Sequence, residues 1–587
     1  MDILGRIWSA ARGGRNSAPE LRAGQAPDAN KEDEAAALRQ RGNALLEQGS
    51  LAEAIACYRR ACESAPEDAL AWLNQGYALL QAGQADAAGD CLRRALSIDS
   101  NLADAHFLLG QSDARRGLLP QALACYDRAL ALDPALSAAA LGRIDLLLDL
   151  QRWQEALAQI DAQGAGQAMP LRQQRARALH GLGCNAEALA CIDQLLAQQP
   201  GDADALHGKA NILLELGDHQ GALDASAQVL AQHPGFADAM GNAGVACMRM
   251  GRLQDALAWF DRGLAQQPRD AAMHWNRGLA LLTLGDLAQG WPEHEWRWGA
   301  TVLRHARAPF TESHPQWAGE PLAGKTLLLH AEQGLGDSIQ FVRYVPLLAA
   351  AGARIVLRVP PALHALCAGL SPACTLLAQD APLPHLDFHC PLMSLPLAFR
   401  TTLDSIPAAG GYLRSDAAKR AHWEQALGPR RGPRVGLVWS GGTQHKNDAN
   451  RSMPLEALLR AVPAHCTPVS LQKEVRPGDA GVLQASGMFH AGAALQGFDD
   501  TAALIDCVDL VVSVDTSVAH LAGALGKRLL LLLPAVPDWR WLLERQDSPW
   551  YASARLFRQG ADAQWAPVLA RVRAELEGAE PQREARC

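Results

Sequence analysis

Apolar and polar positions follow two different patterns in the two parts of this chain. From about residue 35 to 270, apolar and small residues recur in pairs of amphipathic helices. After about residue 320, short apolar runs alternate with helical segments and glycine-containing loops. The first pattern predicts an α-helical repeat array, and the second predicts an α/β region with parallel strands.

The helix pairs repeat with a nearly constant period. One small residue of each second helix recurs at intervals of 34, 34, 34, 32, 34 and 34 residues: Ala54, Ala88, Ala122, Ala156, Ala188, Ala222 and Ala256. This period is typical of tetratricopeptide repeats, which stack into a superhelix whose first helices line a groove. We expect seven repeats, an eighth beginning at residue 271, and a repeat domain spanning 35–300.

Three asparagines are candidate groove residues. Asn74, Asn242 and Asn276 each stand two residues before a glycine of the first helix, where an amide can hydrogen-bond an extended peptide. The alternative is a solvated polar position on a helix. The tryptophan-rich run GWPEHEWRW, which ends the repeats, predicts a buried and rigid joint.

The second pattern predicts two Rossmann-like lobes, 301–430 and 431–587, the latter with a C-terminal helix. Apolar strands are expected at 325–330 and 354–359 in the first lobe and at 434–439, 468–471, 510–515 and 529–534 in the second. A helix is expected from Ser338 to Ala350. The helix near 565–577 could cross back to the first lobe.

Composition narrows the functional classes. The 587 residues carry a net charge of −8, which does not favour a nucleic-acid partner. The 13 cysteines are scattered without zinc spacing, and no run of 18 apolar residues occurs. We expect a cytoplasmic protein without a transmembrane segment, a metal site or a cofactor, and a disordered segment over 1–34.

The stretch DLVVSVDTSVAHLAGALGK is the strongest candidate for a phosphate site. A strand pattern runs directly into a helix that we expect to begin at Asp515 and Thr516, and such a start presents free N–H groups. Ser517 adds a hydroxyl, and His520 follows one turn later. The alternative is a core helix capped by Asp515, with His520 as a satisfied buried histidine.

Two further loops carry candidate chemistry. In QGLGDSIQ, Asp337 is the candidate catalytic base, and Gly334 and Gly336 permit close backbone approach. An N-cap role alone would also explain an aspartate there.

In WSGGTQHKNDANRS, Gly441 forms a tight loop, and Lys446 and Arg451 can reach a phosphate. Lys473 is a candidate neighbour of the nucleotide. A solvated basic loop and a surface lysine are the alternatives. The run PDWRWLLERQDSPWY forms either a wall of the sugar pocket or packing between the lobes, and we assign no site residue to it.

These motifs carry a resemblance. The segment DDTAALIDCVDLVVSVDTSVAHLAGALGK and the loop QGLGDSIQ resemble bacterial heptosyltransferases. Together with the repeats, they resemble repeat-containing bacterial glycosyltransferases, including enzymes that modify flagellin with nonulosonic sugars. The resemblance implies a GT-B fold and an inverting, metal-independent transferase that uses a nucleotide sugar. It also implies Asp337 as the base and places Asp515 near the donor sugar and Thr516, Ser517 and His520 near its phosphates.

Three functions remain open at this point. The first is sugar transfer to Ser or Thr of a protein held by the repeat groove, with flagellin as acceptor and a CMP-activated nonulosonic acid as donor. The second is an O-GlcNAc-transferase-like enzyme that uses UDP-GlcNAc. The third is a repeat scaffold with an inactive transferase domain.

Overall fold

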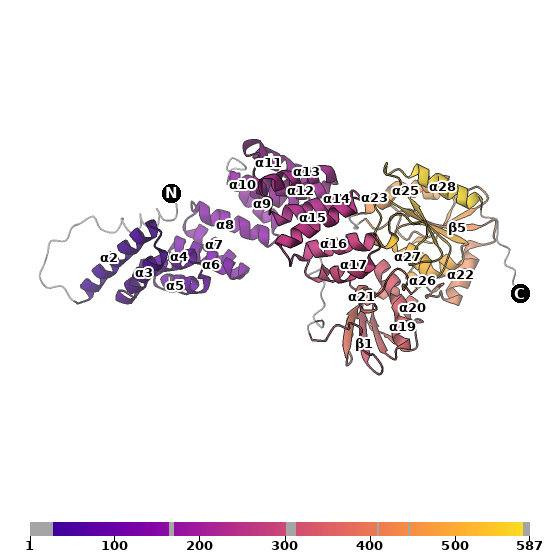
Figure 1. Cartoon of the computed structure of the whole chain (residues 1–587), viewed down its shortest axis with the longest axis horizontal. Helices are drawn as coiled ribbons and strands as arrows, with labels where there is room; N and C mark the ends of the chain where they lie inside the picture. The colour runs from indigo at the N-terminus through magenta and orange to yellow at the C-terminus, as the bar shows by residue number, and fades with distance from the viewer. Residues whose placement is uncertain are drawn as a thin grey trace. The chain divides into compact units, whose positions relative to one another are not determined.

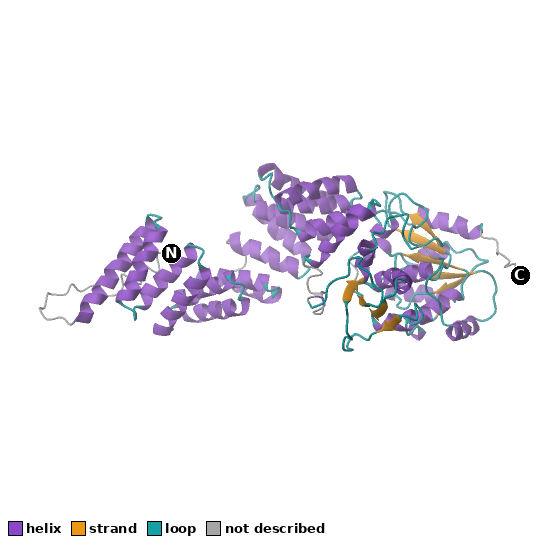
Figure 2. Cartoon of the chain, turned by 60° about the horizontal axis from the view of Figure 1, so that its bottom comes forward, coloured by secondary structure: helices purple, strands orange, loops and turns teal. Residues whose placement is uncertain are grey.

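The computed structural model describes residues 27–163, 169–300, 311, 313–407, 410–443 and 447–578. The chain divides into two compact units, Met1–Gln232 and His233–Cys587. Helices make up the described part of the first unit, whereas the strands lie in the second (Figures 1 and 2).

The repeat region consists of antiparallel helix pairs, as the 34-residue period predicts. In the first unit the helices are α2 (Pro27–Glu47), α3 (Leu51–Ser64), α4 (Ala69–Gln81), α5 (Ala85–Ile98), α6 (Ala103–Arg115), α7 (Leu119–Leu132), α8 (Ser137–Asp149), α9 (Trp153–Ala162), α10 (Met169–Gly181), α11 (Asn185–Gln198), α12 (Ala203–Leu216) and α13 (His219–Gln232). In the second unit they are α14 (Ala237–Arg249), α15 (Leu253–Gln266), α16 (Ala271–Thr283) and α17 (Leu287–His294), followed by η1 (Glu295–Trp298).

Close helix packing explains the repeated glycine of the first helices. A Cβ on Gly110 would lie 2.7 Å from Tyr126 of the partner helix, and a Cβ on Gly244 would lie 2.4 Å from Phe260. Each glycine therefore makes room for a large side chain that fills the interior of the pair. Tyr126 and Phe260 are both buried.

The first helix begins earlier than the sequence pattern indicates. Helix α2 starts at Pro27, within the 1–34 segment that we expected to be disordered. Proline suits a first helical position because the N–H that it lacks has no intrahelical acceptor there. Residues 1–26 lie outside the described part of the chain.

The α/β region contains two parallel sheets, labelled β1 and β5 in Figure 1. The described strands of the first have the order β3-β2-β1-β4: β1 (Thr326–His330), β2 (Arg354–Arg358), β3 (Cys374–Leu376) and β4 (Phe388–Pro391). The second has the order β10-β9-β8-β5-β6-β7: β5 (Arg434–Val438), β6 (Thr467–Ser470), β7 (Phe489–His490), β8 (Leu510–Val514), β9 (Leu529–Leu533) and β10 (Ala554–Arg558). This architecture is consistent with GT-B.

Helices cover both sheets. They are α18 (Leu335–Phe341), η4 (Val342–Tyr344), α19 (Val345–Ala350), η5 (Pro361–Leu363), α20 (His364–Cys367), η6 (Leu392–Ser394), α21 (Leu395–Ala398), α22 (Ala417–Leu427), α23 (Asp448–Arg451), α24 (Leu455–Arg460), α25 (Pro477–Ser486), η7 (Gly492–Ala494), α26 (Phe498–Asp506), α27 (Ser517–Ala524), η8 (Trp539–Trp541) and α28 (Ala566–Glu577).

Helices α28 and α22 both pack on the second lobe. Helix α28 packs on β10 and α24, and Glu575 pairs with Arg528 and Arg555. It therefore stays on the second lobe, and the expected crossing back to the first lobe is wrong in the described chain. Helix α22, which precedes the second sheet, packs against α26 and pairs Lys419 with Asp499.

The tryptophan-rich end of the repeats is buried only in part: Trp291 packs against the α/β region, whereas Trp296 is 37% exposed. The indole of Trp291 donates to the carbonyl of Thr401 at 2.9 Å and meets Trp539 edge to face at 5.4 Å. Arg297 is fully buried and pairs with Glu332 in the loop after β1 at 3.0 Å. Leu282 of α16 and Leu287 and Trp291 of α17 thus share one packed core with the two lobes, which supports the expected joint.

Candidate functional site

The loop after β1 and the loop after β8 meet where both sheets end. The loop after β1 leads into α18, and the loop after β8 leads into α27, so both extend from the carboxyl ends of parallel strands. Parallel sheets bind their ligands at this edge. Helices α18 and α27 are in contact, and a Cβ on Gly336 would lie 2.8 Å from Cδ2 of His520 and 3.6 Å from Cα of Ser517. Gly336 therefore permits the close approach of the two loops.

Asp337 lies in the first turn of α18. This helix begins at Leu335, three residues before the expected start at Ser338, because Gly334 serves as its N-cap residue. The backbone N–H of Gly334 donates to Oδ2 of Asp337 at 2.8 Å, while Nη2 of Arg540 donates to Oδ1. One carboxylate oxygen thus holds the helix start, and the other faces a cation from the second lobe.

Arg540 connects the two lobes at this point. Its side chain is 7% exposed and lies over the ring of Trp539, with the guanidinium carbon 4.3 Å from the ring centroid. Its Nε donates to Oε1 of Gln340 at 2.6 Å, and its Nη1 donates to Asp538 at 2.8 Å. Each of its three nitrogens therefore has a defined acceptor.

Asp515 is partly buried at the end of β8. Burial is the largest cause that raises the pKa of its carboxyl to about 6, and the nearby Asp538 charge adds to the rise. The helix start differs from the expectation, since α27 begins at Ser517 with Thr516 as its N-cap residue. The Thr516 side chain lies 3.3 Å from the Ser513 hydroxyl and makes no capping bond. The carboxylate of Asp515 is therefore not the helix cap.

His520 is buried behind this helix start. Its Nδ1 lies 2.9 Å from the hydroxyl of Tyr551, and its Nε2 lies 3.9 Å from Oδ1 of Asp515. The ring stacks on Trp541 with centroids 5.3 Å apart. Burial, together with the charges of nearby arginines, lowers the pKa of His520 well below its usual value. We conclude that the imidazole is neutral at physiological pH.

The loop after β5 approaches the same helix start. Arg451 donates from Nη1 to the carbonyl of Asp515 at 2.9 Å. A Cβ on Gly441 would lie 2.4 Å from Nη2 of Arg451, so glycine leaves the space that this guanidinium fills. Lys446 lies outside the described residues. Lys473 is exposed in the loop after β6.

The main residue that sequence reasoning missed is Arg540. Its run, PDWRWLLERQDSPWY, contributes buried side chains that contact both lobes, including Trp539, Trp541, Trp550 and Tyr551. Arg343 of the first lobe donates to the carbonyl of Trp550 at 2.8 Å. The available signal was one arginine within a tryptophan-rich turn, which does not distinguish lobe packing from a site.

The three candidate groove asparagines have different surroundings. Asn74 is 4% exposed, and its amide donates to Oδ1 of Asn43 on the preceding first helix at 3.3 Å. Asn242 and Asn276 are half-buried on α14 and α16. Asn74 thus links neighbouring repeats, whereas the other two retain more exposed surface.

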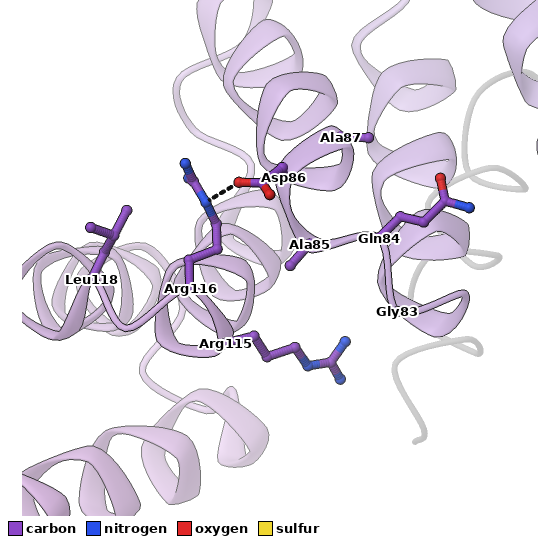
Figure 3. Close-up of a pocket in the computed structure, with 8 residues that line it drawn as sticks. All are labelled: Gly83, Gln84, Ala85, Asp86, Ala87, Arg115, Arg116 and Leu118. Carbon is purple, nitrogen blue, oxygen red and sulfur yellow. Dashed lines mark ion pairs between the residues drawn. The ribbon is translucent and has the colours of Figure 1, made fainter.

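A separate polar cavity of about 610 Å³ lies in the first unit (Figure 3). It is formed by the turns that precede α5 and α7. Arg116 pairs with Asp86 at 2.6 Å and with Asp113 at 3.2 Å, and Arg115 donates to the carbonyl of Leu80 at 2.7 Å. These partners explain its charged lining as contacts between adjacent repeats.

Comparison with known proteins agrees with both parts of the chain. Tetratricopeptide repeat models match residues 42–83, 71–234 and 213–282, and the model described as glycosyltransferase family 9 (heptosyltransferase) matches residues 493–557. Within the described ranges, no helix is both long and apolar enough to cross a membrane.

Among curated proteins, Protein FlbA of Caulobacter vibrioides is 28% identical over 320 residues. The match covers 49% of this chain and 52% of FlbA, so it spans about half the length of that relative. A tetratricopeptide repeat protein from Parabacteroides merdae covers 42% of this chain and 99% of its own at 17% identity, with a TM-score of 0.37. PilF of Pseudomonas aeruginosa covers 36% of this chain and 96% of its own at 20% identity, with a TM-score of 0.31. The chain is a tetratricopeptide-repeat protein with a C-terminal glycosyltransferase family 9 (heptosyltransferase) domain and a distant relative of FlbA.

Proposed function

We propose that the protein transfers a sugar from a nucleotide sugar to a Ser or Thr hydroxyl of an acceptor protein. The observation that carries the proposal is the meeting of the Asp337 loop with the start of α27, where Gly336 packs against His520. The Asp337 carboxylate of the first lobe and the N-terminus of α27 of the second lobe thus lie on either side of the same position. Glycosyl transfer requires a base and a stabilised leaving phosphate at neighbouring positions.

Each residue has a defined role in this reaction. Asp337 accepts the proton of the acceptor hydroxyl while the oxygen of that hydroxyl attacks the anomeric carbon of the donor sugar. The bond from that carbon to the donor phosphate breaks, and the nucleotide leaves with the negative charge. Backbone N–H groups and hydroxyls of Thr516 and Ser517, together with Arg451, stabilise this charge. Asp515 lies beside the donor sugar, and His520 supports the helix start.

The donor-side role also extends to three residues of neighbouring loops. Gly441 makes room for Arg451. Lys446 supplies mobile positive charge near the nucleotide phosphates, and Lys473 lies beside the ribose or base of the nucleotide. The chemistry is inverting and proceeds without a metal ion or another cofactor, which is what the resemblance to heptosyltransferases implies.

The repeats select the protein acceptor in this proposal. Stacked repeats present an extended concave surface, and the amides of Asn242 and Asn276 hydrogen-bond the backbone of a bound peptide there. Asn74 has the equivalent position in an earlier repeat, but its amide already donates a hydrogen bond to Asn43. Flagellin is the acceptor and a CMP-activated nonulosonic acid the donor that we test first.

The intact mass of the acceptor provides the test. Flagellin is incubated with the full-length protein and with CMP-sialic acid, UDP-GlcNAc or ADP-heptose, in parallel with Asp337→Ala and with the control Asp380→Ala. Asp380 is an exposed turn residue of the first lobe. We expect a mass gain with the wild type and the control, and none with Asp337→Ala.

Each alternative has its own outcome in this experiment. A mass gain with UDP-GlcNAc and not with CMP-sialic acid identifies an O-GlcNAc-transferase-like donor. Acceptor binding without mass gain for every donor identifies an inactive scaffold. A mass gain that Asp337→Ala leaves unchanged removes Asp337 from the role of base.

A further inference from the structure

We propose that Arg540 is the positioning residue of Asp337, supplied by the opposite lobe, and that it keeps this carboxylate ionised and aimed for proton transfer. The inference rests on the proposed function, because it concerns the group that we assign as the base. It assigns a role to a segment, PDWRWLLERQDSPWY, that otherwise reads as packing between the lobes.

The geometry leaves the guanidinium little freedom. Nη2 donates to Asp337, Nη1 donates to Asp538 at 2.8 Å, and Nε donates to Gln340 at 2.6 Å. Asp538 also accepts from the backbone N–H of Arg540 at 3.1 Å, which fixes the start of η8. A planar guanidinium with three directed contacts holds its partner's orientation far better than a lysine ammonium would.

The segment that carries Arg540 is anchored on the first lobe. Trp550 contacts Phe341 edge to face at 5.8 Å, and its carbonyl accepts from Arg343. Trp539 packs against Trp291 of the repeat joint at 5.4 Å. Arg540 is therefore held beside α18 by several independent contacts, so the position of the Asp337 carboxylate is set in advance of substrate binding.

The surrounding charges make this cation necessary. Glu332 lies on the loop of Asp337 and is itself paired with Arg297. Asp538 accompanies Arg540, while Asp515 and the neutral His520 lie on the facing β8 and α27. Asp337 thus lies among carboxylates in a partly buried site, where loss of a contacting cation favours the protonated form. A protonated carboxyl cannot accept the proton of the acceptor hydroxyl.

The test compares Arg540→Gln, Arg540→Lys and Asp337→Ala in the full-length protein. Arg545→Gln is the matched control, since Arg545 lies on the same segment and pairs with Asp547 at the surface. The measurement is kcat/KM for release of nucleotide from the donor that the wild type transfers, followed from about pH 5 to about pH 9. Thermal melting of each variant is recorded at the same pH values.

We expect Arg540→Gln to lower kcat/KM about 10²-fold or more, mainly through kcat, because the effect is on the base. The acid limb of the pH profile of Arg540→Gln moves up by about one pH unit or more. In Arg540→Lys, which keeps the positive charge, the limb lies much closer to its wild-type position. A purely structural role would lower activity without moving the limb. The inference is overturned if the wild type is active and Arg540→Gln leaves the acid limb of the pH profile at its wild-type position.

A second measurement separates this inference from the proposed function. If the wild type releases nucleotide from none of the donors, the proposed function fails, and melting of Asp337→Asn, Arg540→Gln and their double variant then tests the pairing. Non-additive melting shifts support the contact as the one that holds Asp337. Additive shifts refute it independently of activity.

Discussion

Replacing Asp515 by asparagine should stabilise the protein, and more so at high pH. The pKa of the carboxyl is raised from 3.8 to about 6, chiefly by burial. The folded chain therefore retains a proton between these values that the unfolded chain releases. The contribution of this carboxyl to stability is most favourable below pH 3.8, falls as the pH rises from there to about 6, and is constant above that, because both states are then ionised.

The size of the effect follows from the shift. A shift of about two pKa units corresponds to about 3 kcal/mol at pH 8, and linkage reduces this to about half at pH 5. Asparagine has nearly the same shape and does not ionise, so Asp515→Asn removes this cost. For a unit of about 350 residues, the melting temperature should rise by about 4 °C at pH 8 and by about 2 °C at pH 5.

Differential scanning calorimetry of the full-length protein at both pH values measures this difference. Asp380→Asn is the control, since Asp380 is exposed and its replacement should not change the melting temperature at either pH. The reasoning fails if Asp515→Asn destabilises the protein at pH 8, or if its gain is larger at pH 5 than at pH 8. The same variant should lose most of its sugar transfer, because a carboxylate beside the donor is lost.

Three further predictions concern Gly336, Arg297 and Asn276. Gly336→Ala should reduce transfer at least about 10-fold and cost about 1–3 kcal/mol, because its Cβ would lie 2.8 Å from His520, whereas Gly442→Ala meets no atom within 4 Å and should be neutral in the same assay. Arg297→Met should lower the free energy of unfolding, measured in urea, by about 3–5 kcal/mol because it leaves Glu332 buried without its cation. The double variant Arg297→Met with Glu332→Gln should lose less, and an equal loss would contradict this reasoning. Asn276→Ala should weaken acceptor binding, measured by calorimetry, and leave nucleotide release from the donor unchanged; equal acceptor affinity would remove this residue from the groove.

The fold was predictable because its signals are local and periodic. The 34-residue spacing indicates the helix pairs, and five-residue apolar runs such as Leu529–Leu533 indicate buried parallel strands. Short strands and strands of mixed composition gave no such signal, and β3, β4, β7 and β10 were not predicted. The start of α18 was predicted three residues late, because an N-cap glycine in a glycine-containing loop also fits an irregular loop.

The candidate site was predictable only in part. Two local motifs indicate the loops of the site. Glycines that follow a strand mark the loop of Asp337, and a strand that runs directly into a helix marks the loop of Asp515. Both motifs can be recognised because they consist of residues adjacent in sequence. The contact between Asp337 and Arg540 joins residues about 200 positions apart. Such a pairing depends on how the two lobes pack, and local sequence carries no information about it.

The packing of α16 and α17 with the lobes sets where this protein can be recombined. A chimera that exchanges the acceptor-selecting repeats at residue 300 would separate Leu282 and Trp291 from the core that they share with the lobes. A splice between α13 and α14, at the boundary of the compact units Met1–Gln232 and His233–Cys587, leaves that core whole. The repeats before this point can therefore be exchanged between proteins, whereas the repeats after it have to be kept together with the transferase lobes.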